Sequence, residues 1–165
     1  MQNITIWSEA FKNGEYIPVE YTCDGKNISP GLSWSGIPAG TKSIALIMDD
    51  PDAPMGTFVH WVLFNIPADI NNLPSRIRNK EPFFTHETHH GTTGFGRIGY
   101  GGPCPPIGVH RYYFRIYALD ALLSMKSGTT RKQLDKAMKE HILATGEFFG
   151  LYKRSNIIED AMRKE

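Results

Sequence analysis

Long apolar runs are absent from this sequence, and its first residues hold no basic stretch followed by an apolar one. The longest strictly apolar runs span only four to five residues, as at residues 61–64, whereas a transmembrane helix needs about 20. We therefore expect no membrane span. A secretory signal is not expected either, because such a signal begins with a basic segment followed by an apolar one.

An excess of charge of one sign is also missing. The chain has 18 basic and 17 acidic residues, and its net charge is +1. This balance gives no electrostatic argument for a nucleic-acid partner or for an anionic membrane surface. Cysteine is scarce too, since Cys23 and Cys104 alone cannot form a disulfide framework. We therefore expect unpaired, inert thiols in a reducing, cytoplasmic compartment.

What remains is the composition of a globular protein. The 165 residues are 41% hydrophobic and 21% charged, with 16 glycines and 11 prolines. This length is enough for one domain with a substantial core, and no repeat, linker or low-complexity tract divides it. Residues 1–165 are therefore interpreted as a single domain. The glycine and proline content favours a loop-rich, mainly β fold.

Four segments have the patterns of strands. Residues 43–49 are almost continuously apolar, as in a strand buried on both faces. Residues 58–66 are rich in aromatic and β-branched side chains. Residues 110–119 alternate, so one face carries the even-numbered side chains and the other the odd-numbered ones. Residues 147–153 form a weaker fourth candidate.

One helix is predicted after a capping box at residues 130–133. Apolar residues follow at helical spacing from Leu134 to Ile142, and Gly146 is the expected stop. The lysines of this segment are interpreted as a solvated outer face rather than a basic contact surface. The tail at residues 156–165 is compatible with a short amphipathic helix or with a frayed end.

A run of carboxylates follows the first predicted strand. Asp49, Asp50 and Asp52 lie within four residues, and Pro51 and Pro54 stiffen the turn. Crowded carboxylates repel one another unless cations or hydrogen-bond donors compensate. The pattern indicates either a polar site at a strand end or a rigid Asp-Pro turn with solvated acids.

A second candidate is the loop at residues 99–112, which holds four glycines and three prolines. It leads to His110 and Tyr112, whose spacing places them on one face of a strand, and His60 lies near the start of a similar strand. These groups with one aspartate would supply donors for a phosphate-like oxyanion. The alternative is that each histidine simply fills a strand end or the core.

The segment from His86 to His90 reads H-E-T-H-H, which satisfies the H-E-x-x-H pattern of zinc proteases. That motif functions only on a helix, and here Pro82 precedes it and a Gly-Thr-Thr-Gly stretch follows it. We therefore expect a polar loop, with adventitious surface metal binding as the alternative. No metal and no cofactor are predicted.

Five segments occur in an order that resembles the phosphatidylethanolamine-binding protein family, which includes Raf kinase inhibitor protein. They are YTCDG at residues 21–25, SPGLSW at 29–34, DPDAP at 50–54, VHW at 59–61 and the loop at 99–112. The loop sequence and the short chain look like the bacterial and archaeal branch. The resemblance implies a β-sandwich with a large antiparallel sheet, a smaller sheet and peripheral helices.

The resemblance also implies a pocket for phosphate-like anions. Backbone N–H groups near Gly102 and the Tyr112 hydroxyl would donate to the anion, and a protonated histidine would add to them. Asp50 would hold a histidine in place or bind an amino group. Anion binding should then weaken as the histidines lose their protons at higher pH. The ligand-binding residues implied are Asp50, Asp52, His60, Gly102, Pro103, His110 and Tyr112.

The function expected is non-enzymatic binding of a small phosphorylated or anionic ligand, such as a phospholipid headgroup. The alternatives are a kinase or protease inhibitor that uses the same pocket and, more remotely, a hydrolase, for which no nucleophile or metal set is evident. The resemblance to prokaryotic relatives suggests a homodimer. Gly31 departs from the family, which often has a second proline there, and no C-terminal helix is expected to border the pocket.

Overall fold

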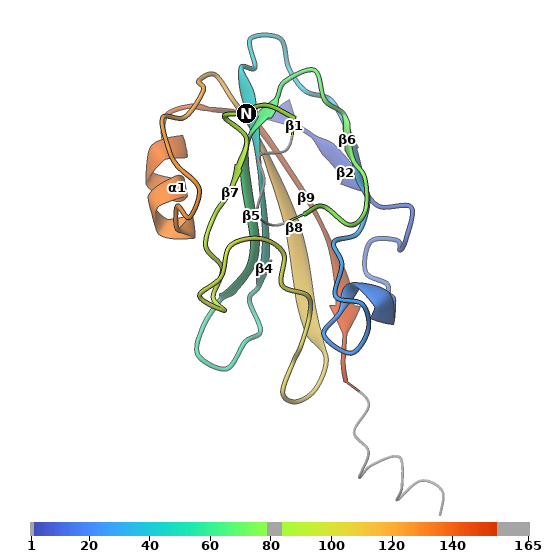
Figure 1. The fold of residues 1–165 in the computed structure, drawn as a ribbon. Coiled ribbons are helices and arrows are strands. Elements are labelled where there is room, and N and C mark those ends of the chain that lie inside the picture. Colours follow the sequence, from blue (N-terminus) through green and yellow to red (C-terminus); the bar gives the residue numbers. More distant parts are fainter. Residues whose placement is uncertain (1, 79–83, 155–165) are drawn as a thin grey trace, which may run out of the picture.

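A six-stranded sheet forms the centre of the computed structural model, which describes residues 2–78 and 84–154 (Figure 1). The tail at residues 156–165 lies outside these residues. All neighbouring strands of the sheet are antiparallel except β1 and β9, which are parallel. In spatial order, the strands are β1 (Gln2–Asn3), β9 (Ile142–Tyr152), β8 (His110–Leu119), β4 (Ser43–Asp50), β5 (Phe58–Pro67) and β7 (His89–His90).

A small sheet and a helix lie on opposite sides of this central sheet (Figure 1). One hydrophobic cluster joins the two sheets, and a second lies between the large sheet and α1. The mainly β sandwich expected from the sequence is therefore confirmed. The remaining elements are β2 (Thr5–Trp7), η1 (Val19–Tyr21), β3 (Leu32–Ser35), β6 (Asn72–Leu73) and α1 (Arg131–Met138).

The central strands owe their position to apolar side chains on both faces. All eight residues of β4 are buried. Its Ile44, Leu46 and Met48 join the cluster between the sheets, whereas Ala45 and Ile47 face the cluster under α1. In β8 the even-numbered side chains from Tyr112 to Ala118 are buried in the first cluster. The predicted alternation of this strand is confirmed.

The capping box at the start of α1 is also confirmed. The Thr130 hydroxyl accepts the N–H of Gln133, and the Gln133 side chain accepts the N–H of Thr130. Leu134 and Met138 are the buried side chains of the helix. Its lysines point away from this buried side, which agrees with a solvated outer face.

The predicted end of the helix is wrong. The helix stops at Met138, Glu140 adopts a positive φ of 76°, and Ile142 opens β9 by pairing with Leu119. The chain from Ile142 onward pairs with β8 along its whole length, so non-local strand pairing prevails over the local helical spacing. Gly146 lies inside β9, where a Cβ atom would collide with the backbone of Ile4.

A bulge shapes the start of β5. Met48 pairs with Trp61 and Asp49 pairs with Val59, so His60 is the extra residue. Because a bulge interrupts the alternation of side chains, His60 and Trp61 both face the side of the sheet that carries Tyr112.

In the described part of the chain, none of the helices is long and apolar enough to cross a membrane.

Candidate functional site

The candidate site lies at the end of the large sheet where β4 stops and β8 begins (Figure 1). Asp50 is the last residue of β4, and His110 is the first of β8. The antiparallel order brings the turn at residues 51–57 and the loop at residues 105–109 to this same end. Chain topology therefore brings together groups that are 60 residues apart in the sequence.

His110 is held between two oxygen acceptors. Its Nδ1 lies 2.6 Å from the Asp50 carboxylate, and its Nε2 lies 3.0 Å from the carbonyl oxygen of Ile107. An ionised carboxylate and a carbonyl both accept hydrogen bonds, so this geometry assigns a hydrogen to each ring nitrogen. His110 is then a cation paired with Asp50, and both residues are buried. Asp50 thus orients a histidine, as one of its two expected roles requires.

His60 has a different electrostatic character. Its Nδ1 donates to the carbonyl oxygen of Gly101 at 2.6 Å. Burial lowers the pKa of His60, and this effect outweighs the opposing contact with Gly101 and the charge of Asp50. A neutral ring that donates through Nδ1 presents Nε2 as an acceptor. Charge-assisted donation to an anion at this site is therefore left to His110.

The hydroxyl of Tyr112 is the unusual group of the site. The side chain is fully buried, and its oxygen has no hydrogen-bond partner of good geometry within residues 2–78 and 84–154. Burial raises the pKa of Tyr112 well above its usual range, and the negative charge of Asp50 adds to this effect. The phenol is therefore a neutral donor. The Asp50 carboxylate and the N–H of Cys104 are nevertheless close enough to act on this oxygen, so the hydroxyl is poorly satisfied rather than isolated. Because a poorly satisfied buried hydroxyl is unfavourable, a well-placed ligand acceptor would be favourable here.

The three carboxylates of the turn are separated. Asp52 receives the backbone N–H of Arg111 at 2.9 Å and two guanidinium N–H groups at 2.8 and 2.9 Å. Asp49 points to the opposite face of the sheet, toward Arg115 and Arg131. Asp50 alone faces His110. The electrostatic repulsion that the sequence predicts among the three carboxylates is relieved, because each carboxylate has its own partner. Asp52 forms an ion pair with Arg111 rather than with a histidine.

The paired Asp52 yields a first testable prediction. Hydrogen bonds from Arg111 lower the pKa of Asp52 to about 2. A depressed pKa means that the pair stabilises the fold above about pH 4, and this contribution is lost as the pH falls toward 2. Carbon-13 NMR should show the Asp52 carboxyl titrating near pH 2. Arg111→Gln should move that titration up toward pH 4, and an unchanged midpoint would contradict the pairing.

The glycine- and proline-rich loop is tied to the segment after η1. The N–H of Gly102 donates to Asn27 Oδ1 at 2.8 Å, and the N–H of Cys23 donates to the Pro103 carbonyl at 3.1 Å. A Cβ at Gly102 would collide with Asn27 and with the Tyr21 carbonyl, which explains the glycine. The Gly102 N–H is thus already engaged. Of the backbone donors expected near this glycine, the N–H of Cys104 is the one that acts on Tyr112.

The expectation of two unpaired thiols is wrong, because Cys23 and Cys104 form a disulfide across 81 residues. Cysteine number alone gave no sign of this pairing, which depends on the loop packing against the segment after η1. The bond also removes the cysteine argument for a reducing compartment, since disulfides persist mainly in oxidising ones.

The H-E-x-x-H segment does not form a helix. His86 lies in a turn, and His89–His90 forms β7, which pairs with β5. The Thr88 hydroxyl donates to the carbonyl oxygen of Asn65, which fixes the segment against the sheet. Among residues 2–78 and 84–154, no group of three or more His, Cys, Asp or Glu side chains is arranged to hold a metal ion.

Two packed sheets with a buried histidine–carboxylate pair at one end define a β-sandwich with a polar site between loops. The sequence model of the phosphatidylethanolamine-binding protein family matches residues 7–153. The chain belongs to that family.

Relatives and solved structures agree with this assignment. The UPF0098 protein of Aquifex aeolicus is 49% identical over 152 residues, which cover 90% of this chain and 88% of the relative. UPF0098 protein PH1269 of Pyrococcus horikoshii is 48% identical over 151 residues, covering 89% and 75%. The crystal structure of a phosphatidylethanolamine-binding protein homologue, CT736 of Chlamydia trachomatis, is 40% identical. It matches with a TM-score of 0.85 over 94% of this chain and 100% of that one. YbcL of Escherichia coli matches with a TM-score of 0.84 at 30% identity, covering 93% and 99%. These matches support the bacterial or archaeal branch.

Proposed function

We propose that the candidate site binds a small phosphorylated or anionic ligand without transforming it. The observation that carries the proposal is the buried hydroxyl of Tyr112, which has no hydrogen bond of good geometry within the described residues and lies beside the Asp50–His110 pair. A phosphate oxygen would accept from this hydroxyl with better geometry than the weak contacts that it makes with Asp50 and Cys104. The name of the family, which refers to phosphatidylethanolamine, supports a ligand of this chemistry.

The charges of the site favour a ligand that carries both signs or a single negative charge. The cation on His110 is balanced by Asp50, Asp52 is balanced by Arg111, and His60 is neutral. A site without net charge gains little from a dianion, because desolvating two charges is costly. A phosphate ester with an amino group fits better. Its phosphate would face Tyr112, and its ammonium group would face the Asp50 carboxylate.

Ligand binding requires a change of partner at His110. The Nε2 hydrogen of this ring is used by the Ile107 carbonyl, so an incoming phosphate oxygen would have to replace that carbonyl. Residues 106–109 are exposed, and Gly108 adopts a positive φ of 72°. We propose that this loop moves when the ligand binds, so that the hydrogen bond from His110 Nε2 to the Ile107 carbonyl is replaced by one to the ligand. His110 would then donate to the phosphate with the assistance of its charge.

A calorimetric titration with phosphate and O-phosphoethanolamine tests the function. We expect saturable binding of both ligands by the natural protein. Tyr112→Phe removes one donor to a charged group, which is worth about 1.5–3 kcal/mol, so affinity should fall by about tenfold or more. Asp50→Asn should also weaken binding, since it removes the carboxylate that orients the His110 ring.

The chain offers a matched control. His141 and Asp120 form a second histidine–carboxylate pair, 2.8 Å apart, but both side chains are 45% exposed and lie away from the site. Asp120→Asn should leave ligand affinity unchanged. Equal losses in Asp50→Asn and Asp120→Asn would refute the assigned site. If no small anion binds at all, the alternative of a protein-inhibitor function that uses the same pocket would be favoured instead.

A further inference from the structure

A second pocket lies behind the glycine-rich loop. It has a volume of about 240 Å³ and is lined by Lys26, Asn27, Thr93, Phe95, Arg97 and residues 98–101. We call it the Lys26–Arg97 pocket. It shares a wall with the candidate site, because the Gly101 carbonyl accepts from His60 Nδ1. The Phe95 ring also lies between the pocket and the candidate site, since it packs edge-on against the His60 ring with the centroids 5.3 Å apart.

The described residues that line this pocket carry only positive charges. Lys26 and Arg97 supply two cations, and no carboxylate of residues 2–78 or 84–154 is part of the lining. Neither side chain forms an ion pair within the described residues 2–78 and 84–154. Asp24, two residues before Lys26, is bound to Tyr152 and Arg154 instead. The Arg97 guanidinium rests over the Phe95 ring at 5.7 Å.

The groove beside α1 provides a comparison within the same molecule. It contains Lys132, Arg115 and Arg131, and the guanidinium groups of the two arginines are bound to Asp49, Asp135 and Glu147. An anion that binds either of these arginines would have to compete with a carboxylate. Arg97 has no carboxylate partner within residues 2–78 and 84–154. The two grooves therefore differ in whether their arginines are available.

The backbone of the pocket is held in place on both sides. Thr93 accepts the N–H of Phe95 with its hydroxyl at 3.2 Å and donates that hydroxyl to the Arg97 carbonyl at 3.0 Å. On the other side, Asn27 is tied to the N–H of Gly102. The two cations are thus carried by restrained turns rather than by free loops. A fixed backbone lowers part of the entropy cost of bringing the two side chains to an anion.

We propose that the Lys26–Arg97 pocket is a second anion-binding site that takes a phosphate or carboxylate group. Arg97 would offer paired N–H donors to such a group, and Lys26 would add a point charge. Because the two sites share the wall formed by Gly101 and Phe95, a ligand with two anionic groups could engage both. The inference rests on the geometry of this pocket and does not require ligand binding at Tyr112.

Phosphate titration followed by backbone NMR tests this site with the full chain. The control titration uses sodium chloride at the same ionic strength, which reports non-specific screening. We expect saturable shifts of the Thr93, Gly99 and Gly101 amides with phosphate. The double variant Lys26→Gln/Arg97→Gln should weaken this response by at least about tenfold. The matched control is Lys12→Gln/Lys136→Gln, which removes the same charge from exposed positions elsewhere and should leave the response intact.

The two sites are distinguishable in this experiment. Tyr112→Phe should weaken the response of the candidate site by about tenfold or more, while the Thr93 and Gly99 shifts persist. Persistence of those shifts in Tyr112→Phe supports the second site even if the function proposed above fails. Shifts that do not saturate, that chloride reproduces, or that survive Lys26→Gln/Arg97→Gln would overturn the inference.

Discussion

Removing the disulfide by Cys23→Ser/Cys104→Ser is expected to lower the free energy of unfolding by about 2–5 kcal/mol. The bond closes a loop of 81 residues, for which the chain-entropy model gives about 4.5 kcal/mol. Most of this effect arises in the unfolded chain, which gains freedom when the cross-link is absent. Urea denaturation monitored by tryptophan fluorescence measures the loss directly.

Chemical reduction supplies the control for this prediction. Reductant should lower the stability of the natural protein to that of the double variant and should leave the double variant unchanged. A thiol assay on unfolded samples establishes whether the bond is present before reduction. If the protein carries the bond and reduction leaves its denaturation midpoint unaltered, the assigned stabilisation is wrong.

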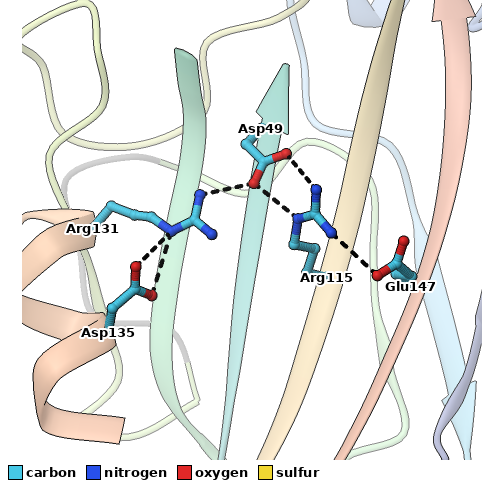
Figure 2. Close-up of polar contacts among 5 residues, drawn as sticks. All are labelled: Asp49, Arg115, Arg131, Asp135 and Glu147. Atoms are coloured by element: carbon cyan, nitrogen blue, oxygen red, sulfur yellow. Dashed lines mark hydrogen bonds and ion pairs between the residues drawn. The ribbon is translucent and has the colours of Figure 1, made fainter. Parts of the chain in front are cut away.

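Asp49→Asn is expected to cost about 3 kcal/mol, because Arg115 and Arg131 lose their buried common partner and keep only the exposed carboxylates of Glu147 and Asp135. Figure 2 shows Asp49 between Arg115 and Arg131, whose guanidinium groups approach it at 2.9 and 2.7 Å. The carboxylate side chain is 1% exposed. Since Arg131 belongs to α1, the variant should also loosen the helix, which hydrogen exchange of the α1 amides would report.

The outer end of the same network provides the comparison. Glu147 binds Arg115 at 3.1 Å, but its side chain is 52% exposed, so Glu147→Gln should cost less than about 1 kcal/mol. A variant with Met or Leu at Asp49, Arg115 and Arg131 together should recover much of the stability that Asp49→Asn loses, because the unpaired charges that remain, on Glu147 and Asp135, are exposed to solvent. Equal costs for Asp49→Asn and Glu147→Gln would show that burial does not govern this network.

The strands and the site were predictable to different degrees. The apolar run of β4 and the alternation of β8 reflect burial that neighbouring residues impose on one another, so a local pattern was sufficient. The predicted helix extends too far because Ile142 fits helical spacing, whereas its pairing with Leu119 is non-local.

The separation of the adjacent carboxylates Asp49 and Asp50 could be predicted from the sequence. Adjacent residues of a strand face opposite sides, so Asp49 and Asp50 could not share a site.

Other features had no local signal. The disulfide depends on the glycine-rich loop reaching the segment after η1. The partnership of Arg131 with Asp49 spans 82 residues. The bulge that turns His60 toward Tyr112 appears only when the pairing of β4 with β5 is known. The expected grouping of Asp50, His60, His110 and Tyr112 came from their places at strand ends and from the family resemblance. Their protonation states required the positions of Ile107 and Gly101.

The brevity of the outermost strands has a consequence for association. β1 and β7, at the two edges of the large sheet, are two residues long each. An open edge with a long row of free N–H and C=O groups is a template for another chain. Here β1 covers part of β9, and the loop after β7 donates N–H groups from Gly91 and Gly94 to β5 carbonyls. The apolar strands β4 and β8 therefore lie inside the sheet. The two edge strands offer only short rows of backbone groups with which a strand of another chain could pair.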